Sequence, residues 1–215
     1  MNGFLRYGGF FNSLIETVLN CLLTSMLWLI CALPVVTLGA SSVALYHTVY
    51  MVIRKEEGKV WAEFWRSFKN NFKQATAVWL ILLLILCFLL ASLYNALVLY
   101  HMEVVPVALP IMIAVVLAWV IMWGSYLFPC IARFQNTTGQ MLKNCSLFVL
   151  LHLIWSLLLL IICLAGIVAF LAVPGLFPVI PVMVALLSSY ALERVFSKYQ
   201  SNDQAEVHTI RENPR

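Results

Sequence analysis

Three ionisable side chains in apolar surroundings are the residues of this chain that could do chemistry: Glu16, His47 and His152. His47 lies seven residues before Arg54, and His152 lies nine residues after Lys143. In helices both histidines would lie about 10–14 Å from those basic residues. Together the three side chains could line a polar cavity, and a proton-driven carrier needs such groups inside its spans. The alternative, which we favour, is that each is satisfied separately by a neighbouring hydroxyl or carbonyl, or reaches the interface.

No motif of a catalytic site is present. The sequence lacks the phosphate-binding pattern G-x-x-x-x-G-K-[ST], the nucleophile pattern G-x-S-x-G and the zinc pattern H-E-x-x-H. Asp203, the only aspartate, lies in the polar C-terminal tail. The six cysteines form no C-x-x-C pair and have no histidine at metal-ligand spacing. We therefore predict a protein that is not an enzyme and that uses no metal or other cofactor.

The composition excludes a soluble domain. The chain is 63% hydrophobic and 10% charged, whereas soluble domains have about 25% charged residues. Its mean hydropathy is +0.96, and 215 residues do not enclose enough interior for so much apolar surface. The excess must face lipid. The net charge of +4 then indicates contact with anionic lipid headgroups rather than with nucleic acid.

Six apolar segments predict six membrane-spanning helices in one all-α domain, residues 1–196. Pro34 ends the first span, and Thr37 is placed to cap the second. The second span is short, about 16 residues or 24 Å, so it crosses only where the bilayer thins. The predicted spans are 14–33, 38–53, 76–100, 107–132, 146–173 and 177–195.

All thirteen lysines and arginines fall on one side of this six-span arrangement. The loops on the other side, around 34–37, 101–106 and 172–178, contain none. Positive charge marks the cytoplasmic face, which predicts a multi-pass protein of the cytoplasmic membrane with both termini inside and a polar tail over 197–215. The basic residues are Arg6, Arg54, Lys55, Lys59, Arg66, Lys69, Lys73, Arg133, Lys143, Arg194, Lys198, Arg211 and Arg215.

The segment 60–73 predicts a separate amphipathic helix on the cytoplasmic side. Its aromatic residues recur at steps of three and four, which is typical of one helical face, and basic residues occupy the other face. Such a helix lies in the plane of the membrane interface. It is either an anchor for the third span or a docking surface for a partner. The docking surface would comprise Trp61, Phe64, Trp65, Arg66, Phe68, Lys69, Phe72 and Lys73.

A run of small residues at the start of the second span predicts close helix packing, because small side chains let backbones approach in lipid. The run comprises Gly39, Ala40, Ser41, Ser42 and Ala44. The alternative is backbone exposed to a solute at a helix N-terminus. A transporter would also need a polar path between the helices. Its candidates are Asn20, His47, Asn95 and His152.

Three blocks of sequence resemble the YesL-like family of bacterial integral membrane proteins, a domain of unknown function. The first block is PVVTLGASSVALY at 34–46, and the second is FWRSFKNNFKQA at 64–75. The third combines ARF at 132–134 with LKN at 142–144. The resemblance covers most of the chain and brings no catalytic residues with it.

The resemblance implies a Gram-positive bacterium and genes beside sugar-importing ABC transporters, their binding proteins and two-component sensors. We therefore expect a non-enzymatic accessory protein of carbohydrate ABC import or its regulation. Its partners would be the lipid bilayer and subunits of the importer or a membrane sensor kinase, and a homo-oligomer stays open. The cytoplasmic loops lack the E-A-A pattern with which a sugar permease docks its ATPase. The alternative function is a small-solute transporter or channel.

Overall fold

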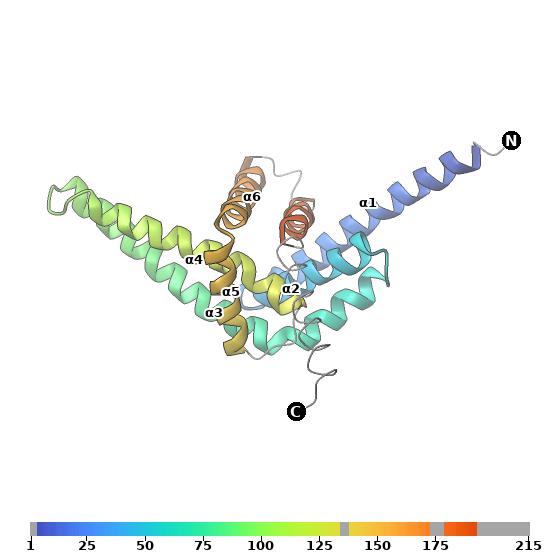
Figure 1. Ribbon diagram of the computed structural model, residues 1–215, viewed down its shortest axis with the longest axis horizontal. Coiled ribbons are helices and arrows are strands. Elements are labelled where there is room, and N and C mark those ends of the chain that lie inside the picture. The colour runs from blue at the N-terminus through green and yellow to red at the C-terminus, as the bar shows by residue number, and fades with distance from the viewer. Residues whose placement is uncertain (1–3, 134–137, 173–178, 193–215) are drawn as a thin grey trace, which may run out of the picture.

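The computed structural model describes residues 4–133, 138–172 and 179–192, and the described residues are helices joined by turns, without strands (Figure 1). An unlabelled helix, Ile180–Leu192, follows the six labelled ones. The α-helices are α1 (Phe4–Ala32), α2 (Leu38–Thr48), α3 (Val60–His101), α4 (Ala108–Arg133), α5 (Thr138–Leu151) and α6 (Leu153–Ala172). A 3-10 turn, Val35–Thr37, precedes α2, and a π-helical segment, Val49–Arg54, extends it.

Four of these helices are long and apolar enough to cross a membrane, so the chain has the build of a membrane protein. The four segments are Ile15–Ala32, Val35–Arg54, Val60–His101 and Ala108–Arg133. A fifth crossing is present if α5 and α6 count as one bent span. The Ile180–Leu192 helix is apolar but shorter. Of the predicted sixth span, residues 177–178 and 193–195 lie outside the described residues, as does the predicted tail 197–215.

The break between α1 and α2 lies at the proline, as predicted. α1 ends at Ala32, and Pro34 has an extended backbone with φ −75° and ψ 114°. Thr37 immediately precedes α2, but its side chain makes no hydrogen bond to that helix. Its hydroxyl instead donates to the carbonyls of Cys31 and Pro34. The predicted capping role of Thr37 is therefore wrong, because the backbone carbonyls left free at the end of α1 are nearer acceptors for the hydroxyl.

The two segments predicted as separate helices, 60–73 and 76–100, form a single helix, α3, of 42 residues. At 1.5 Å per residue α3 is about 63 Å long, roughly twice the thickness of the hydrocarbon core. The ribbon bends within its first half (Figure 1). The residues at the expected boundary, KQAT at 73–76, include no proline or glycine that would end a helix. The sequence changes here from amphipathic to fully apolar, but the helix continues without a break.

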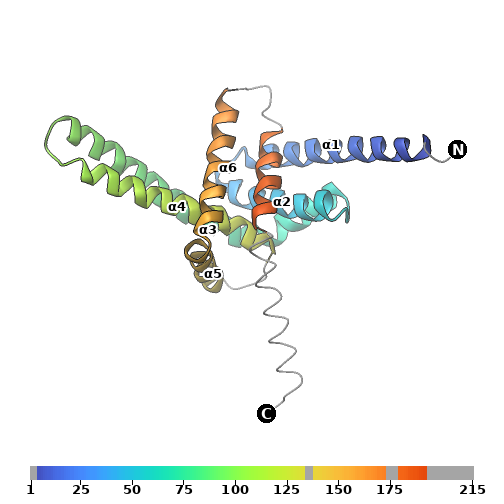
Figure 2. The same cartoon turned by 45° about the horizontal axis from the view of Figure 1, so that its top comes forward.

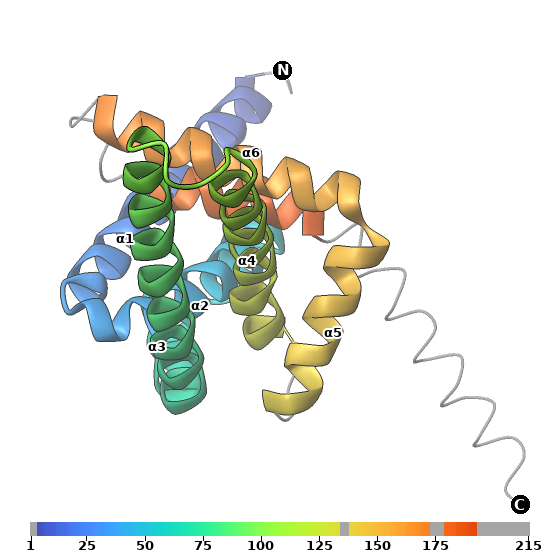
Figure 3. The same ribbon diagram turned by 90° about the vertical axis from the view of Figure 1, so that its left-hand side faces the viewer.

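The predicted span 146–173 is divided between α5 and α6, which meet at His152 with a bend of 104° (Figure 3). Ser156, in the first turn of α6, donates to the carbonyls of His152 at 3.0 Å and Val149 at 3.4 Å. Its hydroxyl thus takes up backbone acceptors at the break. Proline and glycine are both absent between 140 and 165, which is why the apolar run predicted an uninterrupted helix.

The core lies around α2, which packs most extensively against α3 and also contacts α1 and α4. Ala40, Val43 and Ala44 of α2 are fully buried. From this centre α1 extends to one side, and the antiparallel pair α3 and α4 extends to the other (Figures 1 and 2). The extended arms carry exposed apolar side chains, such as Leu84 and Phe88, which are 71% and 72% exposed. In a bilayer such side chains face lipid.

Candidate functional site

The first turns of α3 present one aromatic face, and that face divides between the core and the surface. Phe64 is fully buried and packs with Val60, Leu27, Ala44 and Val52. The predicted docking surface therefore loses Phe64, because α1 and α2 cover its ring.

The other rings of this face form a ladder along α3. Ring centroids are 5.9 Å apart between Trp61 and Trp65, 5.5 Å between Trp65 and Phe68, and 5.4 Å between Phe68 and Phe72. Trp61 is 65% exposed and Phe72 is 37% exposed, while Trp65 and Phe68 are half-buried. The two end rings of the ladder are therefore accessible, whereas the two middle rings are partly covered by the rest of the protein.

Basic side chains flank this ladder. Lys69 and Lys73 are exposed, and so is Arg66. Arg66 forms a salt bridge with Glu63, one turn earlier on α3. The carboxylate of Glu63 also lies 3.1 Å from His47 Nε2 on α2. Glu63 thus connects the start of α3 to α2 and holds Arg66 beside the aromatic ladder.

The predicted cluster of Glu16, His47 and His152 is not assembled. His47 pairs with Glu63 instead, Glu16 is exposed on α1, and His152 lies half-buried at the bend between α5 and α6. Within the described ranges, the structure contains no group of three His, Cys, Asp or Glu residues that could hold a metal ion. His47 thus pairs with a carboxylate and not with the hydroxyl or carbonyl expected from the sequence, and His152 has an interaction of its own.

The small residues of α2 lie against α3. A Cβ atom at Gly39 would lie 2.7 Å from the carbonyl oxygen of Ala75 and would also collide with Trp79. Ala40, Ser41 and Ala44 are fully buried, and Ser42, half-buried, accepts a 3.3 Å hydrogen bond from Trp28 Nε1. These residues act as a seat for a neighbouring helix, which is the structural role expected of small residues in membrane helices.

A cavity of about 550 Å³ lies between α1, α2, α3, α4, α6 and the Ile180–Leu192 helix. Its lining is almost entirely apolar and includes Leu45, Val120, Phe128 and Ile167. The few polar contributors include Ser42, Ser125 and Ser188. A lining of this kind suits a hydrocarbon chain better than a sugar.

The residues predicted to form a polar path do not line this cavity. Asn95 is exposed on α3, so its amide faces away from the helix contacts. Asn20 is half-buried on α1, where its backbone carbonyl accepts a hydrogen bond from Thr24. Sequence hydropathy placed these residues within spans, but the direction of each side chain depends on helix packing.

A cluster of cations and aromatic rings, which the sequence analysis did not single out, lies where the π-helical segment Val49–Arg54, α4 and the last described helix meet. The guanidinium of Arg133 lies 4.1 Å from the centre of the Tyr50 ring, and the Lys55 ammonium lies 5.0 Å from it. Arg54 lies 4.5 Å from the Tyr190 ring and donates to the Ser189 carbonyl at 3.0 Å. We call this set of residues (Tyr50, Arg54, Lys55, Arg133 and Tyr190) the Tyr50 cluster. The i, i+4 spacing of Tyr50 and Arg54 is its one signal in the sequence.

Comparison with known proteins identifies a family model that matches part of the chain. No curated protein and no solved structure shows significant similarity to the chain. A family model described as "Protein of unknown function, DUF624" matches residues 21–93, from within α1 to within α3. The match contains the small residues of α2, the His47–Glu63 pair and the aromatic ladder, whereas the third block of the resemblance, at 132–134 and 142–144, lies outside it.

Proposed function

We propose that this chain is a non-enzymatic accessory protein of a bacterial cell membrane, which binds another membrane protein through the start of α3. The contact surface, here called the α3 surface, comprises Trp61, Trp65, Arg66, Lys69, Phe72 and Lys73. The observation that carries the proposal is the 65% exposure of Trp61 at the end of a ladder of packed rings. A tryptophan exposed beside several cations is typical of a binding surface.

The packing of the ladder favours recognition of a partner. Phe68 within the ladder packs against the buried core, and Phe64 beside it is fully buried, so the exposed rings are held in place before a partner binds. An ordered surface loses less conformational entropy on binding. The adjacent cations favour a partner segment that carries acidic residues among apolar ones.

The bilayer surface is the competing target for these same side chains. Basic amphipathic helices with Trp and Phe bind the membrane interface, and in that case the α3 surface anchors the long helix. The two roles predict different neighbours for Trp61. A partner protein would lie within crosslinking distance in the first role, and lipid alone in the second.

The nature of the partner is proposed from the family resemblance. The match to a family of unknown function over residues 21–93 fits the resemblance of blocks 34–46 and 64–75 to YesL-like proteins. That resemblance supports a subunit of a carbohydrate ABC importer, or a membrane sensor kinase, as the partner. The absence of an E-A-A loop supports an accessory role over that of the permease.

Photo-crosslinking in native membranes tests this function. A photoreactive amino acid replaces Trp61, and a matched one replaces Tyr94, which is 70% exposed on the apolar part of α3. We expect an importer subunit or a sensor kinase to be captured from position 61 and not from position 94. Capture of lipid alone from position 61 would contradict the proposal and support the anchoring role.

A small-solute transporter is the second candidate, because the 550 Å³ cavity could hold a small molecule. The apolar lining and the positions of Asn20, His47, Asn95 and His152 give it less support. Flux through proteoliposomes is its test. A solute flux that falls with His47→Ala and His152→Ala together would favour the transporter, and no flux would count against it.

A further inference from the structure

The apolar cavity ends beside the Tyr50 cluster, and this holds on three separate helices. Tyr46 and Pro129 line the cavity, while Tyr50 and Arg133 follow them by four residues, about one helical turn. On the last described helix, Ser188 lines the cavity and the next residue, Ser189, accepts a hydrogen bond from Arg54. A group of cations therefore lies about one helical turn beyond the last lining residues of the apolar space.

Arg54 and Lys55 form no ion pair among the described residues. Arg54 uses one nitrogen, Nη1, for hydrogen bonds to Ser189. Lys55 is exposed. Clustered cations at the edge of a helix bundle attract an anion, and basic pockets between membrane helices bind anionic lipid headgroups.

We propose that the cavity and the Tyr50 cluster together bind one anionic phospholipid. An acyl chain occupies the cavity, and the lipid phosphate lies against Arg54 and Lys55. The volume of about 550 Å³ is within the range of about 300–1,000 Å³ of ligand pockets. A phospholipid has the same order of parts as the site, with an anionic headgroup joined through glycerol to its hydrocarbon chains.

The headgroup decides the selectivity of this site. Hydrocarbon in the bilayer is already as apolar as the cavity, so moving the chain between them changes the free energy little. The contact between phosphate and cations adds about 1 kcal/mol per basic residue, or about fivefold in affinity. Anionic lipid should therefore be retained in preference to zwitterionic lipid of the same chain length.

Native mass spectrometry of the purified full-length protein tests the proposal. Protein in mild detergent is titrated with phosphatidylglycerol, with phosphatidylcholine of equal chain length, and with inorganic phosphate alone. We expect one tightly bound phosphatidylglycerol, weaker phosphatidylcholine, and no binding of phosphate at the same concentration. Equal retention of the two lipids, or binding of inorganic phosphate as strong as that of phosphatidylglycerol, would overturn the proposal.

Matched variants separate the head from the chain. Lys55→Gln should weaken phosphatidylglycerol binding about fivefold, whereas Lys59→Gln, at an exposed lysine outside the cluster, should leave it unchanged. Ser188→Phe should fill the cavity and displace the lipid, whereas Leu187→Phe, on the exposed side of the same helix, should not. Equal effects within either pair would refute the site.

A second measurement follows the acyl chain directly. Trp28 lines the cavity, so phosphatidylglycerol with brominated acyl chains should quench its fluorescence. We expect stoichiometric quenching in the wild-type protein and a smaller quenched fraction in Trp28→Phe, because the Trp28 component is lost. Quenching that is the same with and without Trp28 would place the chain elsewhere. Crosslinking from position 188 to a protein instead of a lipid would show that a partner helix occupies the cavity, and would also overturn the proposal.

Discussion

His47 Nε2 and Glu63 Oε2 lie 3.1 Å apart and join α2 to the start of α3 across the basic turn between them. The side chains are 20% and 12% exposed, so solvent screens the contact only in part. The same carboxylate pairs with Arg66. Glu63 therefore fixes the first turn of α3 against α2 and also positions Arg66, a cation of the α3 surface.

Glu63→Ala should destabilise the protein, because it removes the acceptor of both His47 and Arg66. We expect a loss of about 1–3 kcal/mol in the free energy of unfolding, measured by denaturation in detergent. Glu57→Ala, at an exposed glutamate in the preceding turn, is the control and should change stability by less than about 0.5 kcal/mol. A neutral Glu63→Ala would show that the pair contributes nothing to the helix contact.

Gly39→Ala should weaken the contact between α2 and α3, since the added methyl group would lie 2.7 Å from the Ala75 carbonyl oxygen. The helices would have to separate, at a cost of about 1–3 kcal/mol. The matched change is Gly139→Ala, where a new Cβ meets nothing within 4 Å. Thermal unfolding of the two purified variants checks the difference, and equal melting temperatures would refute close packing at Gly39.

Tyr50→Leu should destabilise the junction of the π-helical segment Val49–Arg54, α4 and the last described helix. The change removes the ring that faces Arg54, Lys55 and Arg133, and each such contact is worth about 0.5–2 kcal/mol. Tyr50→Phe keeps the ring and should retain most of the stability. If both variants lost the same stability in urea unfolding, the hydroxyl would matter and not the ring.

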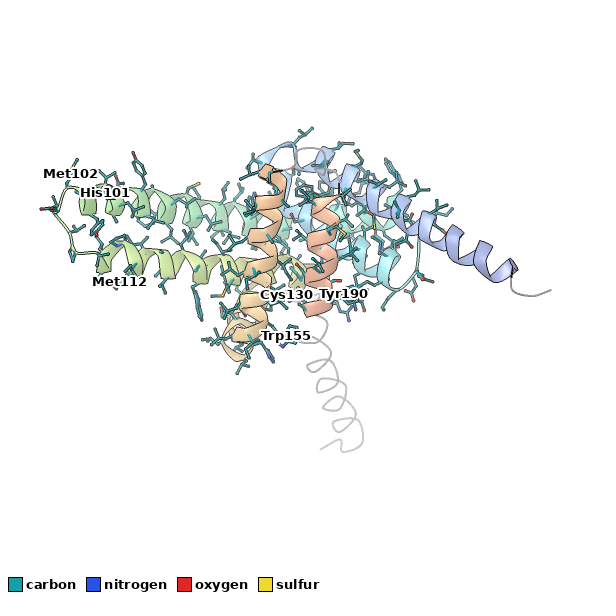
Figure 4. All side chains as sticks on the ribbon, turned by 90° about the horizontal axis from the view of Figure 1, so that it is seen from above. His101, Met102, Met112, Cys130, Trp155 and Tyr190 are labelled. Carbon is teal, nitrogen blue, oxygen red and sulfur yellow. The ribbon has the colours of Figure 1, made fainter. Side chains whose placement is uncertain are left out.

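Reporter fusions should establish the topology that we propose, six spans with both termini in the cytoplasm. The turn between α3 and α4, with His101 and Met102, lies at the far tip of that helix pair, whereas Tyr190 lies in the middle of the molecule (Figure 4). We expect a reporter after Lys69 to be cytoplasmic and reporters after Glu103 and Gly175 to be outside. A cytoplasmic reporter at Gly175 would mean that the bent pair α5 and α6 does not cross the bilayer.

Hydropathy predicted α4 within one residue at each end and predicted the break at Pro34, because both follow from local chemistry. Proline removes a backbone donor wherever it stands, and an apolar run of this length has few alternatives to a helix. The continuity of α3 and the bend at His152 were not predicted. Neither is marked by proline or glycine, so each depends on what packs against the helix.

The amino-acid sequence by itself determined that the chain is a helical membrane protein, since composition and apolar length are properties of each segment alone. Only the tertiary structure decided which side chains meet. It paired His47 with Glu63 and not with Glu16, buried Phe64 while leaving Trp61 exposed, and brought Arg54 and Arg133 to one aromatic ring. The physical reason is that the rotation of each helix about its axis is set by contacts with its neighbours, and hydropathy does not record it.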